Sequence, residues 1–154
     1  FNSTSTLMNK TNCLKVEKLA TGQLNTFISG TSGCTGDDSE KWMYDALGKI
    51  HNKQYIDQCI TTLSGNVVNL MPCSGTASQI WEVDTAQQAI KQSNQCFDLE
   101  GGYLTNNRAR LIRYRCTNGG NQKWTSLPIN NSLILAGLSS KNLPIATKLL
   151  KVNP

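Results

Sequence analysis

The sequence predicts an all-β fold built from three similar repeats, and two observations support this prediction. The first is composition: the 154 residues include 12 glycines and many Asn, Ser and Thr, and only 16% are charged. Such a chain has little material for long amphipathic helices and much for turns. The second is a regular spacing of cysteines and tryptophans. The length suits one domain, so we expect residues 1–154 to form a single one.

The cysteines and tryptophans share one spacing along the chain. In each consecutive pair of cysteines, the second is followed eight residues later by a tryptophan: Cys34 by Trp42, Cys73 by Trp81, and Cys116 by Trp124. This spacing uses every cysteine and every tryptophan in the sequence. We therefore expect repeats over about 7–46, 47–87 and 88–127, followed by a C-terminal extension over 128–154.

Disulfides fit the six cysteines better than a metal site does. Zinc sites need closely spaced cysteines or cysteines with histidines, whereas this chain has no CxxC and one histidine, His51. A repeat that cannot bury its own face is expected to carry its own cross-link. The predicted disulfides are Cys13–Cys34, Cys59–Cys73 and Cys96–Cys116. Because disulfides persist in oxidising compartments, they indicate a secreted or extracellular protein.

Short segments with strand character lie in the repeats at 48–51, 66–70 and 111–114, separated by Gly- and Asn-rich turns. No membrane span is expected, because the most apolar stretch, 133–138, is far shorter than the roughly 18–20 residues required. In the extension, 132–136 resembles a strand and 146–152 is apolar and basic. We expect the extension to complete the barrel; docking on it or leading to a partner are the alternatives.

The first residue, three Asn-containing motifs and the net charge bear on the processing and the partners of the chain. The chain begins at Phe1, which fits either removal of a signal peptide or excision from a longer chain. Asn2, Asn9 and Asn130 each begin an N-glycosylation acceptor pattern. The net charge of +5 comes without the dense Lys/Arg blocks expected of a nucleic-acid binder, so we expect no nucleic-acid partner.

The tryptophan segments resemble the Q-x-W signature of ricin-type β-trefoil lectins. The second and third repeats read Gln79-Ile80-Trp81 and Gln122-Lys123-Trp124, while the first departs with Glu40-Lys41-Trp42. The resemblance covers about residues 7–127 and implies a pseudo-threefold barrel capped by hairpins. It also implies buried tryptophans, a structural hydrogen-bonding role for the Gln, and a sugar-binding, non-enzymatic module that needs no cofactor or metal.

The same resemblance implies one sugar pocket per repeat. In the family each pocket uses an Asp two residues after the first cysteine, an aromatic residue two before the second, and an Asn just before Q-x-W. The third repeat has the full set, Asp98, Tyr114, Asn121 and Gln122, and Ile112 precedes Tyr114 by two residues on the same strand. The first repeat has Lys15, Ser32 and Ser39, and the second has Thr61, Met71 and Ser78. We therefore expect one working pocket, in the third repeat.

The residue types suit this role. A carboxylate accepts hydrogen bonds from sugar hydroxyls, an amide both donates and accepts, and the apolar face of galactose stacks on a tyrosine ring. The implied partners are galactose- or N-acetylgalactosamine-containing glycans on glycoproteins or glycolipids. The implied role is the targeting or adhesion part of a toxin or larger secreted protein, whose partner domain or subunit would be a toxin or an enzyme. Arg113 is a departure, because this strand position is usually apolar; it could bulge outward or skew the pocket.

The alternatives to a galactoside lectin are a binding module for acidic glycans and an enzyme. We expect Arg108, Arg110, Arg113 and Arg115 to crowd one strand, where they could bind sulfated or sialylated glycans, in which case binding should weaken with salt. A solvated strand edge is the simpler interpretation. An enzyme needs catalytic partners that the sequence does not supply. Asp37, Asp38 and Glu40 could imitate a carboxylate pair, but acidic residues in such a loop are expected to be solvated.

Overall fold

The computed structural model describes residues 5–9, 12–30 and 35–128, and in these ranges the chain is all-β, as predicted. The strands are β1 Ser5–Asn9, β2 Asn12–Lys18, β3 Leu24–Ser29, β4 Lys41–Tyr44, β5 Ile50–Asn52, β6 Gln58–Thr62, β7 Val68–Pro72, β8 Glu82–Asp84, β9 Ala89–Gln92, β10 Gln95–Leu99, β11 Arg108–Ala109, β12 Leu111–Arg115 and β13 Thr125–Pro128. Five single 3₁₀ turns punctuate them: η1 Asp38–Glu40, η2 Ser64–Asn66, η3 Ala77–Gln79, η4 Glu100–Gly102 and η5 Gly120–Gln122. No helix in the described part of the chain is long and apolar enough to cross a membrane.

Two of the predicted strand segments begin later than expected. The segment 48–51 becomes a strand only from Ile50, because Gly48 belongs to a turn and has a positive φ of 93°. The segment 66–70 becomes a strand only from Val68, because Asn66 ends the η2 turn, also with positive φ. The segment 111–114 lies within β12, as predicted.

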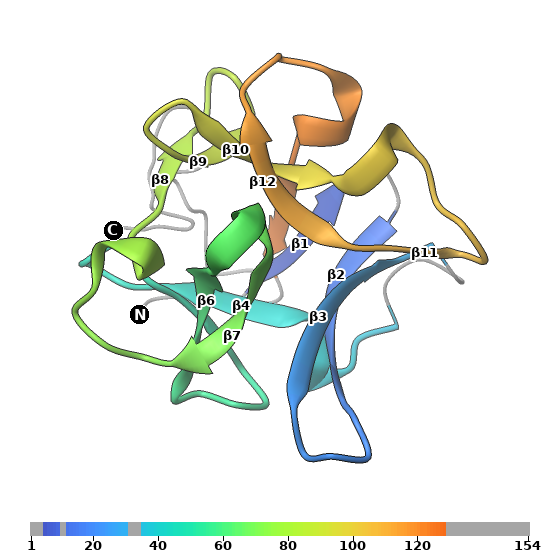
Figure 1. Ribbon diagram of the computed structural model, residues 1–154, viewed down its shortest axis with the longest axis vertical. Coiled ribbons are helices and arrows are strands. Elements are labelled where there is room, and N and C mark those ends of the chain that lie inside the picture. Colours follow the sequence, from blue (N-terminus) through green and yellow to red (C-terminus); the bar gives the residue numbers. More distant parts are fainter. Residues whose placement is uncertain (1–4, 10–11, 31–34, 129–154) are drawn as a thin grey trace.

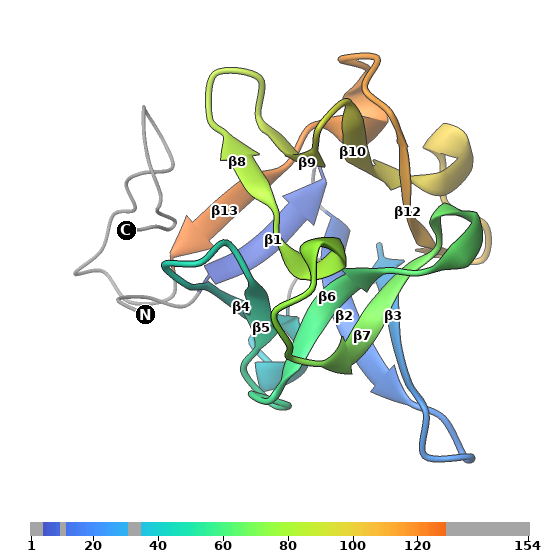
Figure 2. The same ribbon diagram turned by 60° about the vertical axis from the view of Figure 1, so that its left-hand side comes forward.

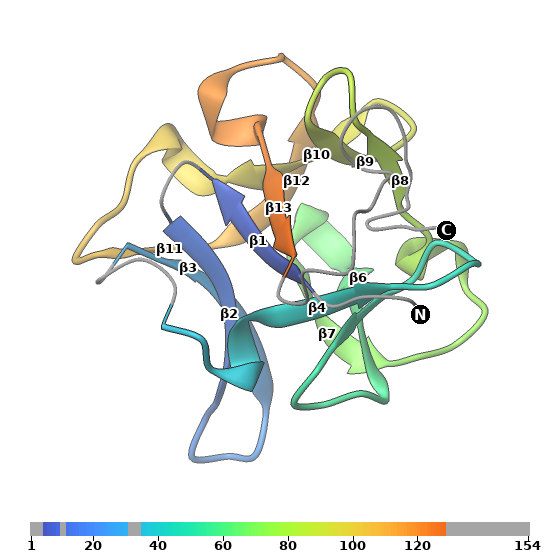
Figure 3. The ribbon, with the colours of Figure 1, turned by 180° about the vertical axis from the view of Figure 1, so that it is seen from behind.

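The sheets curl so that the first strand lies beside the last one described. β1 pairs antiparallel with β13, β2 and β4, and Figures 2 and 3 show β1 and β13 side by side. β8, β9, β10 and β12 form a second, four-stranded sheet. A bridge between Val67 and Ile112 connects the second and third repeats. Figure 1 shows the resulting arrangement of hairpins around a common centre.

The three tryptophans occupy equivalent buried positions. Each indole Nε1 donates to the carbonyl of the residue that follows the first cysteine of its own repeat: Trp42 to Leu14 at 3.0 Å, Trp81 to Ile60 at 2.9 Å, and Trp124 to Phe97 at 3.1 Å. All six of these residues belong to one hydrophobic core. The Phe97 ring packs edge-on against Trp81 and Trp124, with centroids 4.7 and 5.7 Å apart. The predicted core role of the tryptophans is confirmed, and the repeated hydrogen bond displays the pseudo-threefold symmetry.

Two of the three predicted disulfides are present. Cys59 is bonded to Cys73, and Cys96 to Cys116. Cys34 lies outside the described residues, so the Cys13–Cys34 bond remains a prediction. The extension from 129 onward, Ser32, Asn2 and Asn130 also lie outside the described residues.

Asn9 is not a usable glycosylation site in the folded protein. Its side chain is 1% exposed, and Nδ2 donates to the carbonyls of Gly120 and Lys123, both at 2.9 Å. Both amide hydrogens are therefore used to join β1 to the η5 turn. Asn9 therefore matches the acceptor pattern in the sequence, but in the folded chain its side-chain nitrogen is buried and hydrogen-bonded.

Candidate functional site

The third repeat presents its predicted residues on two adjacent strands and one turn. In the antiparallel pairing of β10 with β12, Asp98 is opposite Ile112 and Cys96 is opposite Tyr114. Residues opposite each other, and residues two apart on one strand, point to the same face of a sheet. Asp98, Ile112 and Tyr114 therefore share a face. Asn121 lies on the η5 turn beside it.

The Asp98 carboxylate is held by two amides. Its Oδ1 accepts from Asn121 Nδ2 at 3.0 Å, and its Oδ2 accepts from Gln122 Nε2 at 2.9 Å. Burial raises the pKa of the Asp98 carboxyl above its usual value; the Gln122 and Asn121 amides oppose this rise, and the charge of Glu100 adds to it. Each carboxylate oxygen has a second lone pair, so Asp98 can still accept hydrogen bonds from a ligand's hydroxyl groups.

Gln122 supports the site without being free to donate to a ligand. Its Nε2 donates to Asp98 and to the Arg115 carbonyl at 2.9 Å, which uses both amide hydrogens. Its Oε1 accepts from the Thr117 backbone N–H at 2.7 Å. The side chain is buried. Gln122 is thus a positioning residue that fixes the carboxylate of Asp98 relative to the loop after Cys116.

Asn121 and Tyr114 form the more accessible part of the site. Asn121 is half-buried, and its Nδ2 also reaches the Leu99 carbonyl at 3.3 Å. The Tyr114 side chain is 48% exposed, and the Arg115 guanidinium carbon lies 5.8 Å from its ring centroid. An exposed ring beside a fixed carboxylate and amide offers a stacking surface next to hydrogen-bonding groups.

The second repeat has the same support but lacks the ligand-facing chemistry. Gln79 Oε1 accepts from the Ser74 N–H at 2.6 Å, and its Nε2 donates to the Pro72 carbonyl at 2.9 Å, as Gln122 does with the equivalent backbone groups. The carboxylate position is Thr61, whose hydroxyl accepts from Gln79 and donates to the Cys59 carbonyl. Met71 takes the place of the aromatic residue.

The first repeat replaces the acid–amide pair by a cation–acid pair. Glu40 occupies the Gln position and accepts from the Thr35 and Gly36 N–H groups at 2.8 and 2.9 Å. Lys15 occupies the Asp position, with its Nζ 3.2 Å from Glu40 Oε2. Burial opposes ionisation of Glu40, but the hydrogen bonds from Gly36, Thr35 and Lys15 outweigh it and lower the pKa of the carboxyl.

The expectation that Glu40 is solvated is therefore wrong. Its side chain is 0% exposed because it performs the loop-supporting role that Gln performs in the other repeats. Asp37 and Asp38 are exposed, as expected. The three carboxyl groups consequently differ in environment, and Glu40 is already occupied by the bonds that hold its own loop.

The four arginines predicted to crowd one strand are divided between β11 and β12, with Arg110 between the two strands. Three of them have a carboxylate or amide partner, whereas Arg115 is exposed, with its guanidinium carbon 5.8 Å from the Tyr114 ring centroid. Arg108 forms two hydrogen bonds with the Glu17 carboxylate, at 3.1 and 2.6 Å, and lies 3.9 Å above the Phe27 ring. Arg110 forms two with Glu100, at 2.7 and 2.8 Å. β11 is the terminal strand of its sheet, where it pairs with β3, and Arg108 and Arg110 are both exposed at this edge, as the solvated-edge interpretation predicts.

Arg113 neither bulges nor skews the pocket. The pairing of β10 with β12 is continuous from Gln95–Arg115 to Leu99–Leu111, so strand alternation places Arg113 on the face opposite Tyr114. Its guanidinium donates to Asn66 Oδ1 at 2.9 and 3.2 Å and to Gln92 Oε1 at 2.8 Å. Arg113 thereby connects the second and third repeats.

The one grouping of potential metal ligands found in the described part of the chain is His51 with Cys59 and Cys73. The two sulfur atoms are bonded to each other, so they do not supply the thiolates that a metal would need. The His51 ring nitrogens lie 2.8 Å from Asp45 Oδ2 and from the Ile56 carbonyl. This arrangement is structural in the oxidised protein.

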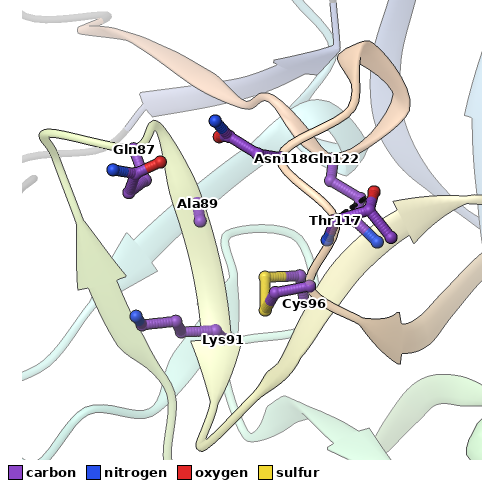
Figure 4. Close-up of a pocket in the computed structure, with 8 residues that line it drawn as sticks. Gln87, Ala89, Lys91, Cys96, Thr117, Asn118 and Gln122 are labelled. Carbon is purple, nitrogen blue, oxygen red and sulfur yellow. Dashed lines mark hydrogen bonds between the residues drawn. A yellow bond between two sulfur atoms is a disulfide. The ribbon is translucent and has the colours of Figure 1, made fainter.

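A cavity of about 320 Å³ lies in the third repeat, between β9 and the loop after Cys116. Figure 4 shows the Cys96–Cys116 disulfide at its base, with Gln87 and Lys91 on one side and Asn118 on the other. Of the residues predicted to bind the sugar, Gln122 alone lines this cavity. Asp98 and Tyr114 do not line it, so it is separate from the predicted pocket.

The chain is similar to a known family of lectin domains and to a curated lectin. The family described as "Ricin-type beta-trefoil lectin domain" matches residues 3–124. Beta-galactoside-specific lectin 3 of Viscum album is 30% identical over 95 residues, covering 59% of this chain and 16% of that protein. The chain therefore spans a small part of that relative's length.

Two solved structures share the fold. The β-trefoil lectin of the Vibrio vulnificus hemolysin/cytolysin, with N-acetyl-D-lactosamine bound, has a TM-score of 0.66 at 15% identity, covering 85% of this chain and 98% of that one. The C-terminal half of an earthworm R-type lectin, in complex with GalNAc, has a TM-score of 0.68 at 14% identity, covering 82% and 98%. The three tryptophan-centred repeats, the two described disulfides and the match over residues 3–124 show that this chain belongs to the ricin-type β-trefoil lectin domain family.

Proposed function

We propose that the chain binds galactose- or N-acetylgalactosamine-type glycans through a single pocket in the third repeat. Asp98 and Asn121 would supply the hydrogen bonds, Tyr114 the stacking surface and Ile112 a side wall, while Gln122 positions Asp98. The observation that carries the proposal is the Asp98 carboxylate held at 2.9–3.0 Å by Gln122 and Asn121 on the same sheet face as the exposed Tyr114. No other described repeat has a carboxylate and an aromatic ring at these positions.

The chemistry of the pocket favours a sugar with one continuous apolar face. An ionised carboxylate accepts from two vicinal hydroxyl groups, and a ring stacks on the C–H face of a pyranose. Galactose presents such a face because its C4 hydroxyl is axial. The Viscum relative is named as β-galactoside-specific, and the two solved structures contain N-acetyl-D-lactosamine and GalNAc; these ligands support the same choice here.

The proposal extends to the setting in which the domain acts. One open pocket for one sugar is expected to bind with a Kd from millimolar to high micromolar, about −4 to −6 kcal/mol. Adhesion would then need several copies, which raise the avidity by roughly 10²-fold or more. We infer a secreted or extracellular targeting or adhesion module of a toxin or larger protein. The disulfides and the hemolysin/cytolysin neighbour support this setting.

The test is an NMR titration of the purified chain with galactose, N-acetylgalactosamine, glucose and a sulfated disaccharide, at low and high salt. We expect galactosides to shift the amides of residues 98–102 and 111–122, with little effect of salt. Asp98→Ala should abolish the shifts, whereas Asp57→Ala, which removes an exposed carboxylate from the second repeat, should leave them unchanged.

A second variant separates binding from folding. Asp98→Ala removes one acceptor from the buried Gln122 amide and one from the half-buried Asn121 amide, so its fold must be checked by the amide spectrum. Tyr114→Ala removes an exposed ring and none of the supporting hydrogen bonds, and it should weaken galactoside binding in a protein with a native spectrum. Salt-sensitive shifts at Arg108–Arg115, produced by the sulfated sugar alone, would overturn the proposal in favour of acidic-glycan binding.

A further inference from the structure

A groove lies between the first and third repeats, on a part of the surface that the proposed pocket does not use. It encloses about 270 Å³ and is lined by β3 on one side and by the segment from η4 to Arg110 on the other. The side by side placement of β3 and β11 follows from their pairing and is visible in Figure 1. The groove therefore belongs to the junction between two repeats and not to the pocket of either one.

The groove contains the most exposed aromatic ring in the described ranges. The Tyr103 side chain is 70% exposed and forms part of the lining. Two successive residues with φ of +79°, Gly101 and Gly102, fold the chain back just before it, a conformation that glycine adopts without strain. The turn thus presents an accessible ring toward an open groove. An accessible ring of this kind is a stacking surface for the C–H face of a sugar.

Each charged residue that lines the groove is paired with a residue of opposite charge. Arg108 is bound to Glu17 and Arg110 to Glu100, each through two hydrogen bonds. The pairs leave no unbalanced charge to attract an anion, but each guanidinium keeps N–H donors beyond the two it uses. Thr105, a residue with a hydroxyl side chain, also lines the groove. Such a lining suits a neutral, hydroxyl-rich ligand better than a sulfated or carboxylated one.

The groove is reached from the proposed pocket by following the β10–β12 ladder for two residues. Beyond the Asp98–Ile112 pair, the ladder continues through Leu99–Leu111 to a hydrogen bond of 3.1 Å from the Glu100 N–H to the Arg110 carbonyl. Two residues along a strand is about 7 Å. The groove therefore begins one short step from the residues that would hold the terminal sugar.

We propose that this groove is an extension subsite, in which Tyr103 contacts the next neutral sugars of a glycan whose terminal galactoside occupies the Asp98 pocket. This inference rests on the proposed function and deepens it. The subsite lets a domain with one pocket discriminate between glycans that share the same terminal sugar. Because its charges are internally paired, the additional affinity is insensitive to salt.

The experiment compares two ligands, methyl β-galactoside and a neutral, galactose-terminated linear tetrasaccharide, by calorimetry or NMR titration. Wild type should bind the tetrasaccharide more tightly than the monosaccharide. Tyr103→Ala should reduce the tetrasaccharide affinity about threefold to tenfold, the usual effect of losing one aromatic contact, and leave the monosaccharide affinity unchanged. Tyr103→Phe should retain the gain. Leu47→Ala, which removes a similarly exposed side chain from a remote turn (69% exposed), is the matched control.

The outcomes separate this inference from the proposed function. If wild type binds both ligands and Tyr103→Ala leaves their affinity ratio unchanged, the extension subsite is refuted while the galactoside pocket stands. Equal affinity of wild type for the two ligands refutes it in the same way. If wild type binds neither ligand, the pocket itself is refuted and the subsite with it.

Discussion

Lys15 and Glu40 form an ion pair of 3.2 Å at the two positions that Asp98 and Gln122 occupy in the third repeat. The polarity of the pair is reversed. In the third repeat the Gln side chain donates a hydrogen bond to the carboxylate of the Asp. The carboxylate of Glu40 has no hydrogen to donate, so it needs a donor at the other position, and the Lys15 ammonium group is that donor. The same exchange that maintains the loop of the first repeat removes the carboxylate that a sugar would need.

This reversal predicts a compensating pair of substitutions. Glu40→Gln should lower the free energy of unfolding by about 1–3 kcal/mol, because the Lys15 ammonium then faces an amide N–H group instead of a carboxylate. Adding Lys15→Asp should recover most of the loss by rebuilding the Asp–Gln pair of the third repeat. Urea unfolding of the two single variants and the double variant measures the coupling. Simple addition of two destabilising effects would contradict the proposed equivalence.

The raised pKa of Asp98 predicts acid-sensitive sugar binding. Hydroxyl groups donate to the ionised carboxylate, so affinity should fall as the pH drops through the raised value, which begins at a less acidic pH than for an ordinary Asp. A raised folded-state pKa means that the folded chain holds this proton more tightly than the unfolded chain, so protonation of Asp98 does not itself unfold the protein. Galactoside titrations over a pH series, with a folding check at each pH, measure the profile.

A control variant assigns the profile to Asp98. His51 is the only histidine in the sequence and lies in the second repeat, so His51→Asn should leave the shape of the profile unchanged. An affinity that stays constant until the protein unfolds would show that the ionised carboxylate is not required for binding.

The contacts of Arg113 predict a structural role and no role in binding. Arg113→Ala removes three hydrogen bonds to Asn66 and Gln92, and we expect a loss of about 1–3 kcal/mol in the free energy of unfolding. Galactoside affinity should not change, because the side chain is on the opposite face from Tyr114. Arg115→Ala, at an exposed neighbouring position, is the matched control and should cost little stability. Loss of sulfated-glycan binding in Arg113→Ala would instead support the acidic-glycan hypothesis.

Much of this arrangement could be predicted from the spacing of a few residues. The cysteine–tryptophan offsets identify the repeats, two of the disulfides and the buried indoles, because each repeat must bury its own tryptophan. The partners of Arg113 and Arg108 could not be predicted, since Asn66 and Glu17 lie far away in sequence and meet them only in the folded chain. The burial of Glu40 could have been inferred: it occupies the structural Gln position, and that signal outweighs the loop composition around it.

The two described disulfides predict a difference between stability and binding. Each closes a loop, of 14 residues for Cys59–Cys73 and 20 for Cys96–Cys116, so replacing either pair by alanines should reduce the free energy of unfolding by a similar amount, about 3 kcal/mol. Their effects on galactoside affinity should differ. Cys116 follows the Tyr114 strand and precedes the loop that Gln122 holds through the Thr117 N–H, so its loss loosens both sides of the pocket. The Cys59–Cys73 variant, equally destabilised but with an intact third repeat, should bind as wild type does under conditions where both variants are folded. Equal losses of affinity in the two variants would mean that the pocket responds to the stability of the whole domain and not to its own disulfide.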